Sequence, residues 1–192
     1  METQNKNIIE LALIPVKLLL ICAAIALLVS FVNANTADII AAYEEAKTNA
    51  ALAEAFPEAK SFSPLELPEG LDKTVTSAHV AINSDAAPGG YAVMCEPMGF
   101  KDIISMMVSF ETDGTVESVR IISLSETTGI GDKVMSDESF TAQFGGKTGE
   151  LTVGNNVDAI AGATISSKAV TAGVNSAIAC VSKIIDAKGG NE

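Results

Sequence analysis

A run of fifteen residues without a charged side chain, Leu18–Val32, constrains this chain more than any other feature of its sequence. About 20 apolar residues in a helix span the hydrocarbon core of a bilayer. Residues 11–16 are mostly apolar and lengthen the run, and Lys17 can extend its ammonium group to water along its own methylene groups. The sequence therefore predicts one transmembrane helix over about residues 9–33, within a membrane anchor of residues 1–34.

A cleaved signal peptide is the alternative interpretation of this segment, with Lys6 and Lys17 in its charged region and Val32–Ala34 as a small-residue cleavage site. Both interpretations deliver the rest of the chain to the same side of the membrane. Lysines precede the apolar run, whereas Asp38 and Glu44 follow it. The positive-inside rule then predicts a cytoplasmic N-terminus and an extracytoplasmic domain.

The charge of the chain excludes one class of partner. Twelve Lys and Arg face 24 Asp and Glu, which gives a formal net charge of −12. Glu2 and Glu10 balance Lys6 and Lys17 in the first 35 residues, so the whole −12 belongs to the remainder. Nucleic-acid binding needs a basic cluster that neutralises phosphates, and the sequence has none, so we expect no nucleic-acid partner.

The segment after the anchor has the pattern of a connection. Residues 36–56 have apolar residues three and four apart and end at Pro57, which predicts a helix. Residues 61–70 contain prolines and a glycine without a period, which indicates a loop. We therefore expect residues 35–72 to connect the anchor to a single domain over residues 73–192.

Alternating apolar residues predict strands in the first half of that domain, at Val75–Ile82 and Gly90–Glu96. The clearest local pattern is a hairpin of Ile103–Phe110 and Val116–Leu124. Asp113-Gly114 lies between these two runs and favours the positive φ angles of a tight turn.

Helices are predicted mainly in the second half. A short helix capped by Ser136 is expected to end at Gly145-Gly146, and a strand is expected at Leu151–Val153. An apolar stripe from Ile165 to Ile184 predicts a final helix that ends before Gly189. The expected fold class is α+β, with a twisted antiparallel sheet and helices packed on it.

Several familiar sites are excluded by the sequence. His79 is the only histidine, so a histidine-based metal site or catalytic triad is not expected. Gly146-Lys147-Thr148 lacks the glycine that a phosphate-binding loop needs five residues earlier, where Thr141 stands. Gly129-Ile130-Gly131 lacks the third glycine of a dinucleotide fingerprint and follows a hairpin.

The three cysteines show no metal-binding or redox spacing. Cys22 lies in the apolar run, and Cys95 and Cys180 are far apart in the sequence. Two buried free thiols are the interpretation that we favour for the latter pair, and a disulfide between them is the alternative.

One turn in the sequence has the chemistry of a phosphate site. Asp158–Thr164 (DAIAGAT) leads into the predicted final helix, where unpaired backbone N–H groups and the positive end of the helix dipole favour an anion. Gly162 and Ala163 are small enough for a bulky group to approach closely. From these residues alone, a Thr164 that merely caps the helix stays an open interpretation. The next polar residues are Ser166, Ser167 and Lys168.

This turn resembles the flavinylation motif of the FMN-binding domain family, in which an Asp precedes a [Ser/Thr]-Gly-Ala-Thr group. The chain keeps Asp158 and Gly162–Thr164 but has Ala161 where the family usually has a hydroxyl residue. The resemblance implies that a phosphoester links Thr164 to FMN and that a flavin transferase attaches it from FAD. It also implies that the cofactor is surrounded by Asp158, Gly162, Ala163, Ser166, Ser167 and Lys168.

A second segment is similar to the same family. Residues 125–133 (SETTGIGDK) resemble a Ser-Glu-Thr-Pro-Gly-Leu-Gly segment that packs against the isoalloxazine ring, with Thr128 in place of the proline. Gly129 and Gly131 would allow close backbone approach to a flat ring. The cofactor-binding residues implied here are Glu126, Thr127, Thr128, Gly129, Ile130 and Gly131.

The resemblance runs from about Gly90 to the final helix. Among membrane members, the chain is similar to the G subunits of Rnf-type ion-translocating ferredoxin:NAD oxidoreductase complexes; the related C subunits of sodium-pumping NADH:quinone oxidoreductases are typically longer. The resemblance implies an electron carrier that docks with iron–sulfur and flavin subunits of a membrane complex. A stand-alone membrane-tethered flavoprotein and a non-redox binding module are the alternatives.

Overall fold

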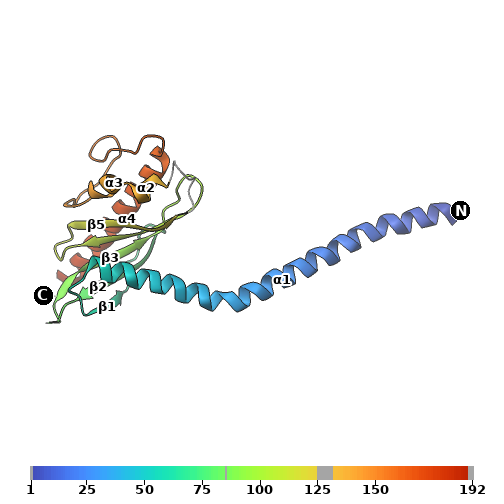
Figure 1. Cartoon of the computed structure of the whole chain (residues 1–192), viewed down its shortest axis with the longest axis horizontal. Coiled ribbons are helices and arrows are strands. Elements are labelled where there is room, and N and C mark those ends of the chain that lie inside the picture. The colour runs from blue at the N-terminus through green and yellow to red at the C-terminus, as the bar shows by residue number, and fades with distance from the viewer. Residues whose placement is uncertain (1, 85, 125–131, 190–192) are drawn as a thin grey trace. The chain divides into compact units, whose positions relative to one another are not determined.

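The computed structural model describes residues 2–84, 86–124 and 132–189 (Figure 1). The chain divides into two compact units, Met1–Ala46 and Lys47–Glu192. Helix α1 (Glu2–Ala55) forms the first unit, and its last turns belong to the second. Among its described residues, the second unit also contains a sheet and three further helices.

Helix α1 continues without a break through the predicted anchor and the predicted connecting helix. At the end of the apolar run, the Thr36 hydroxyl donates to the Val32 carbonyl at 2.9 Å, so this polar side chain bonds within the helix. By length and composition, the part of α1 over Leu13–Ala55 could cross a membrane. Thr164–Ala187 passes the same test, although much of it is buried inside the second unit.

The second unit is built on an open, five-stranded antiparallel sheet in which strands follow one another in sequence order. The α+β prediction is confirmed. The predicted hairpin is present, but Gly114 has a φ of +88° and Asp113 is not among the residues with positive φ. The strands are β1 (Ser61–Leu65), β2 (Val75–Ile82), β3 (Pro88–Cys95), β4 (Ile104–Phe110) and β5 (Val116–Leu124).

Strand β1 corrects the prediction of a loop over residues 61–70. It pairs with β2, and Pro64 lies opposite His79. Proline has no backbone N–H to donate, but an edge strand needs to pair on one side only. The proline and the lack of alternating apolar residues are the reasons why the sequence pattern predicts a loop rather than a strand here.

Two local predictions in the second half are wrong. Leu151–Val153 is not a strand; Val153 makes an isolated bridge to Val157. The residue that caps the short helix is Asp137, whose side chain accepts the Ser139 N–H at 3.1 Å. Ser136 instead ends a separate turn, so there are two helices, α2 (Lys133–Ser136) and α3 (Glu138–Ala142).

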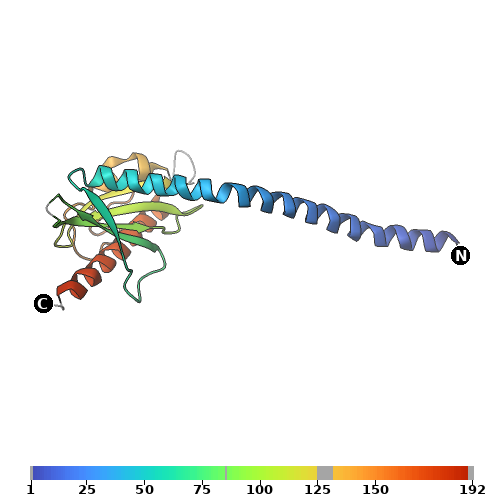
Figure 2. The ribbon, with the colours of Figure 1, turned by 90° about the horizontal axis from the view of Figure 1, so that it is seen from below.

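Both faces of the sheet are covered, as the alternation of its side chains requires (Figure 2). Helix α4 (Thr164–Gly189) packs on one face, and the last turns of α1 pack on the other. The α4 face buries Val93, Met106, Val108 and Phe110 against Val170, Val174, Ala177 and Val181. The α1 face buries Ala92, Met94 and Met107 against Ala51, Leu52 and Phe56.

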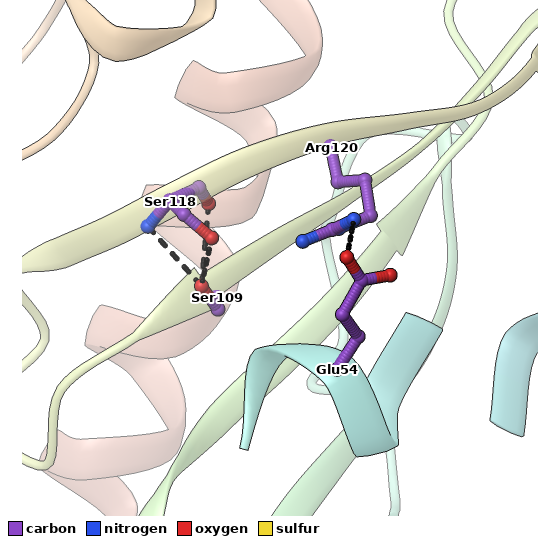
Figure 3. Close-up of polar contacts among 4 residues, drawn as sticks. All are labelled: Glu54, Ser109, Ser118 and Arg120. Carbon is purple, nitrogen blue, oxygen red and sulfur yellow. Dashed lines mark hydrogen bonds and ion pairs between the residues drawn. The ribbon is translucent and has the colours of Figure 1, made fainter. Parts of the chain in front are cut away.

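Polar contacts add to the α1 face (Figure 3). Arg120 of β5 pairs with Glu54 of α1 at 2.7 Å, and both side chains are substantially exposed. The hydroxyls of Ser109 and Ser118 bond across β4 and β5 at 2.7 Å. Because exposed ion pairs contribute at most about 1 kcal/mol, apolar packing rather than this pair holds α1 on the sheet.

Replacement of Leu52 tests that packing. Leu52 is 1% exposed, so we expect Leu52→Ala to lower the free energy of unfolding by about 2–4 kcal/mol. The matched control, Leu67→Ala, removes a side chain that is 39% exposed and should cost less than about 1 kcal/mol. Denaturant unfolding followed by circular dichroism measures both; equal losses would contradict this packing account.

The cysteines give a second prediction. Cys95 and Cys180 are buried and free, and burial raises the pKa of the Cys95 thiol to about 12 and that of Cys180 above its ordinary value. Since the thiolate is the reactive form, neither should react with iodoacetamide at pH 8 in the native protein, and both should react after unfolding without reductant. Mass spectrometry of the alkylated peptides gives the readout; a pair that stays unlabelled in denaturant would indicate a disulfide.

Candidate functional site

Thr164 is the first residue of α4 and its side chain is exposed. The Ala163 carbonyl accepts the Ser167 N–H at 2.9 Å, so Ala163 occupies the position that caps the helix. This placement answers the open interpretation of the sequence, because Thr164 lies inside the first turn and is not the capping residue. The Thr164 hydroxyl therefore stands at the positive end of a 26-residue helix.

A tight turn brings the chain to this position. The Ala163 N–H donates to the Ile160 carbonyl at 2.9 Å, and Gly162 between them has a φ of +84°. A side chain at Gly162 would meet no atom within 4 Å, so the backbone conformation rather than lack of room requires glycine.

The other predicted residues around Thr164 divide into two groups. Gly162, Asp158 and Lys168 are exposed, and Lys168 stands one turn after Thr164 on the same side of the helix. Ala163, Ser166 and Ser167 are buried, at 3%, 1% and 0% exposed. The N–H groups of Ala163 and Ser167 are already bonded, to the Ile160 and Ala163 carbonyls respectively.

Side-chain amides form hydrogen bonds with the backbone of the loop before Thr164, and no pattern in the sequence predicted these contacts. Asn175 of α4 bonds both the N–H and the carbonyl of Leu151, at 2.9 and 2.8 Å. Asn156 accepts the Thr152 N–H at 2.7 Å. Gln143 bonds the backbone of Asp158 in the same two-sided way. The contacts of Gln143 and Asn175 join residues 15 and 24 apart in the sequence, so no local pattern could reveal them.

Closer to Thr164, a hydroxyl holds the loop. The Ser167 Oγ accepts the Ile160 N–H at 3.1 Å, and the Thr171 hydroxyl donates to the Ser167 carbonyl at 2.8 Å. Ser167 is thereby a structural anchor of the turn. That Ser167 also lies beside the cofactor stays a prediction.

The second predicted segment lies outside the described residues, which include none of Glu126, Thr127, Thr128, Gly129, Ile130 and Gly131. The structure does describe the residues on either side of this segment. Leu124 at the end of β5 pairs with Ile104 at the start of β4, and α2 begins at Lys133 and contacts α4 (Figure 1).

The β3–β4 connection carries exposed apolar residues at this end of the sheet. Met98 and Phe100 are 66% and 65% exposed, and Met98 bridges to Ile103. Pro97 lies against α4, because a Cβ added to Gly173 would be 3.0 Å from its Cγ. The sequence does offer a signal here, since turns between strands are usually polar and Met98-Gly99-Phe100 is not.

Titratable groups give little sign of acid–base or metal chemistry. Burial lowers the pKa of His79, whose strand position is opposite Pro64 and Ala92. Bonds from Ser139 lower the pKa of Asp137, which fits its capping role. Within the residues that the structure describes, no group of three or more His, Cys, Asp or Glu side chains could hold a metal ion.

Comparisons with known proteins identify a matching family profile and a similar fold. The profile of the FMN-binding domain family matches residues 99–179, which include Thr164 and most of the loop contacts. A crystal structure of NqrC from Shewanella oneidensis has the same fold, with a TM-score of 0.50 at 18% identity over 70% of this chain and 87% of that one.

Curated relatives define the family. The G subunit of the proton-translocating ferredoxin:NAD(+) oxidoreductase complex of Clostridium ljungdahlii is 40% identical over 95 residues, 46% of this chain and 51% of that protein, so the match spans about half of that relative. The G subunit of the Na(+)-translocating complex of Acetobacterium woodii is 31% identical over 202 residues, 93% of this chain and 96% of that protein. With identity at this level across both whole sequences, the chain belongs to the G-subunit family of ion-translocating ferredoxin:NAD(+) oxidoreductase complexes.

Proposed function

We propose that this chain is an electron-carrying subunit of a membrane-bound, ion-translocating ferredoxin:NAD(+) oxidoreductase complex, with FMN joined by a phosphoester to Thr164. The observation that carries the proposal is the place of Thr164: an exposed hydroxyl in the first turn of a long helix, directly after an open glycine turn. The family profile and the G-subunit relatives support the flavin and the complex.

The residues present fit a flavin phosphate. The first intrahelical bond of α4 runs from the Ser167 N–H to the Ala163 carbonyl, so the N–H groups of Thr164 and Ile165 precede it, and the helix dipole places about half a positive charge there. Lys168 adds a full positive charge one turn later. In a domain with a net charge of −12, this is a local arrangement that favours an anion.

Attachment would use the Thr164 hydroxyl as nucleophile. A bond would form between Thr164 Oγ and the FMN phosphorus of FAD as the P–O–P bond of FAD breaks. AMP would leave, and the hydroxyl proton would pass to a base of the flavin transferase. Bound FMN would supply one- and two-electron transfer. Exposed apolar residues Met98 and Phe100, and the segment 125–131, are the parts of this chain that we assign to covering the ring.

The membrane part of the proposal rests on α1. Its segment Leu13–Ala55 is long and apolar enough to span a bilayer, and we assign the crossing to about residues 9–33. Lys6 and Lys17, which precede the uncharged run Leu18–Val32, favour a cytoplasmic N-terminus on the bacterial inner membrane, with the FMN domain outside the cytoplasm. A covalent bond would then keep a flavin that could not be replaced from the cytoplasm.

Substitution of Thr164 tests the attachment. In a host that contains the flavin transferase, Thr164→Ala should abolish the flavin fluorescence of the denatured protein band, whereas Thr164→Ser keeps a hydroxyl and should retain part of it. Thr152→Ala, which alters an exposed threonine in the same loop, should label fully. Fluorescence that persists in Thr164→Ala would refute the assignment.

Assembly is tested in native membranes. After solubilisation in mild detergent, the chain should co-migrate on a native gel with other redox subunits and with ferredoxin:NAD(+) oxidoreductase activity. Flavinylated chain that migrates alone under conditions that preserve that activity would favour the stand-alone flavoprotein, and chain without flavin would favour the binding module.

A further inference from the structure

Gln143 contacts the motif from outside it. Its Oε1 accepts the Asp158 N–H at 2.7 Å, and its Nε2 donates to the Asp158 carbonyl at 3.3 Å. One planar amide thus bonds both backbone groups of a single residue, as a neighbouring strand does in a sheet. Two bonds of this kind fix the direction of the chain at Asp158 as well as its position.

We propose that Gln143 is a positioning residue for the attachment of FMN to Thr164; this inference rests on the proposed function. Gln143 holds the start of the segment Asp158–Thr164, while Ser167 holds its middle through the Ile160 N–H at 3.1 Å. The Gly162 turn then leads directly to Thr164. The segment is therefore tied to the domain at two points before it reaches the acceptor.

The anchor itself is rigid because it is continuous with the core. Gln143 directly follows α3, between Phe140 and Phe144, which are 1% and 0% exposed. The two rings contact edge to face, with centroids 5.4 Å apart. Asp158 is thus bonded to a side chain whose backbone is fixed by two buried aromatic residues.

Positioning matters because the new bond requires the Thr164 Oγ to approach phosphorus in one orientation. A segment that is already ordered does not lose conformational freedom when it enters the transferase. Removal of both Gln143 bonds leaves the Thr164 hydroxyl chemically intact but frees the start of the segment. We therefore expect each folded molecule to accept FMN more slowly. The number of molecules that can be modified should not change.

The test uses full-length apoprotein, purified in detergent from a host without the transferase, with added transferase and FAD. Gln143→Leu removes both bonds and should lower kcat/KM for the acceptor about tenfold, with KM for FAD unchanged and the same final extent of labelling. Gln143→Glu keeps the acceptor for the Asp158 N–H and should lie between Gln143→Leu and wild type. Thr141→Val is the matched control, because the bond that the structure describes for the Thr141 hydroxyl goes to the Glu138 carbonyl within α3, at 3.2 Å.

The readouts separate positioning from folding. A variant in which part of the population is irreversibly unfolded lowers the final extent of labelling and leaves the rate constant of the folded fraction unchanged. That pattern, or wild-type rate constants in both Gln143 variants, would overturn the inference. Should Gln143→Leu fail to fold, the rate constant of Gln143→Glu decides, and equality with wild type refutes the role. Wild-type protein that gains no flavin refutes the proposed function instead.

Discussion

The close packing of α4 on the sheet determines where the candidate site lies. Gly173 marks a close approach: an added Cβ would be 2.9 Å from the Met106 sulfur and 3.0 Å from Pro97. About two turns later, Cys180 and Val181 are buried in the same core. Because this contact fixes the helix along its length, the first residue, Thr164, is held at the edge of the domain with its side chain exposed.

The scaffold and the loop before Thr164 are stabilised by different forces. Strand pairing and apolar burial hold the sheet and α4, whereas side-chain amides and a hydroxyl hold residues 150–163. The loop contains no strand, and its one isolated bridge joins Val153 to Val157. Such an arrangement keeps the loop on the surface while its conformation stays defined.

Sequence patterns predicted the elements whose signals are local. The β4–β5 hairpin has alternating apolar residues around Asp113-Gly114, and α4 has an apolar stripe, so both were found. Strand β1 was missed because Pro64 is tolerated only by virtue of its edge position, which is a tertiary property.

The same distinction between local and long-range signals applies to the residues of the candidate site. Thr164 and Gly162 were found from a short motif, and the structure adds the turn that connects them. Gln143 and Asn175 were missed because each bonds a backbone group 15 or 24 residues away. The buried state of Ser166 and Ser167 also depends on which side of α4 faces the sheet.

Mass spectrometry of the peptide that contains Thr164, taken from the native membrane, tests the central claim most directly. We predict a peptide that carries the mass of FMN joined through a phosphoester, with fragmentation that assigns the group to Thr164. An unmodified Thr164 peptide, or FMN on another residue, would contradict the account.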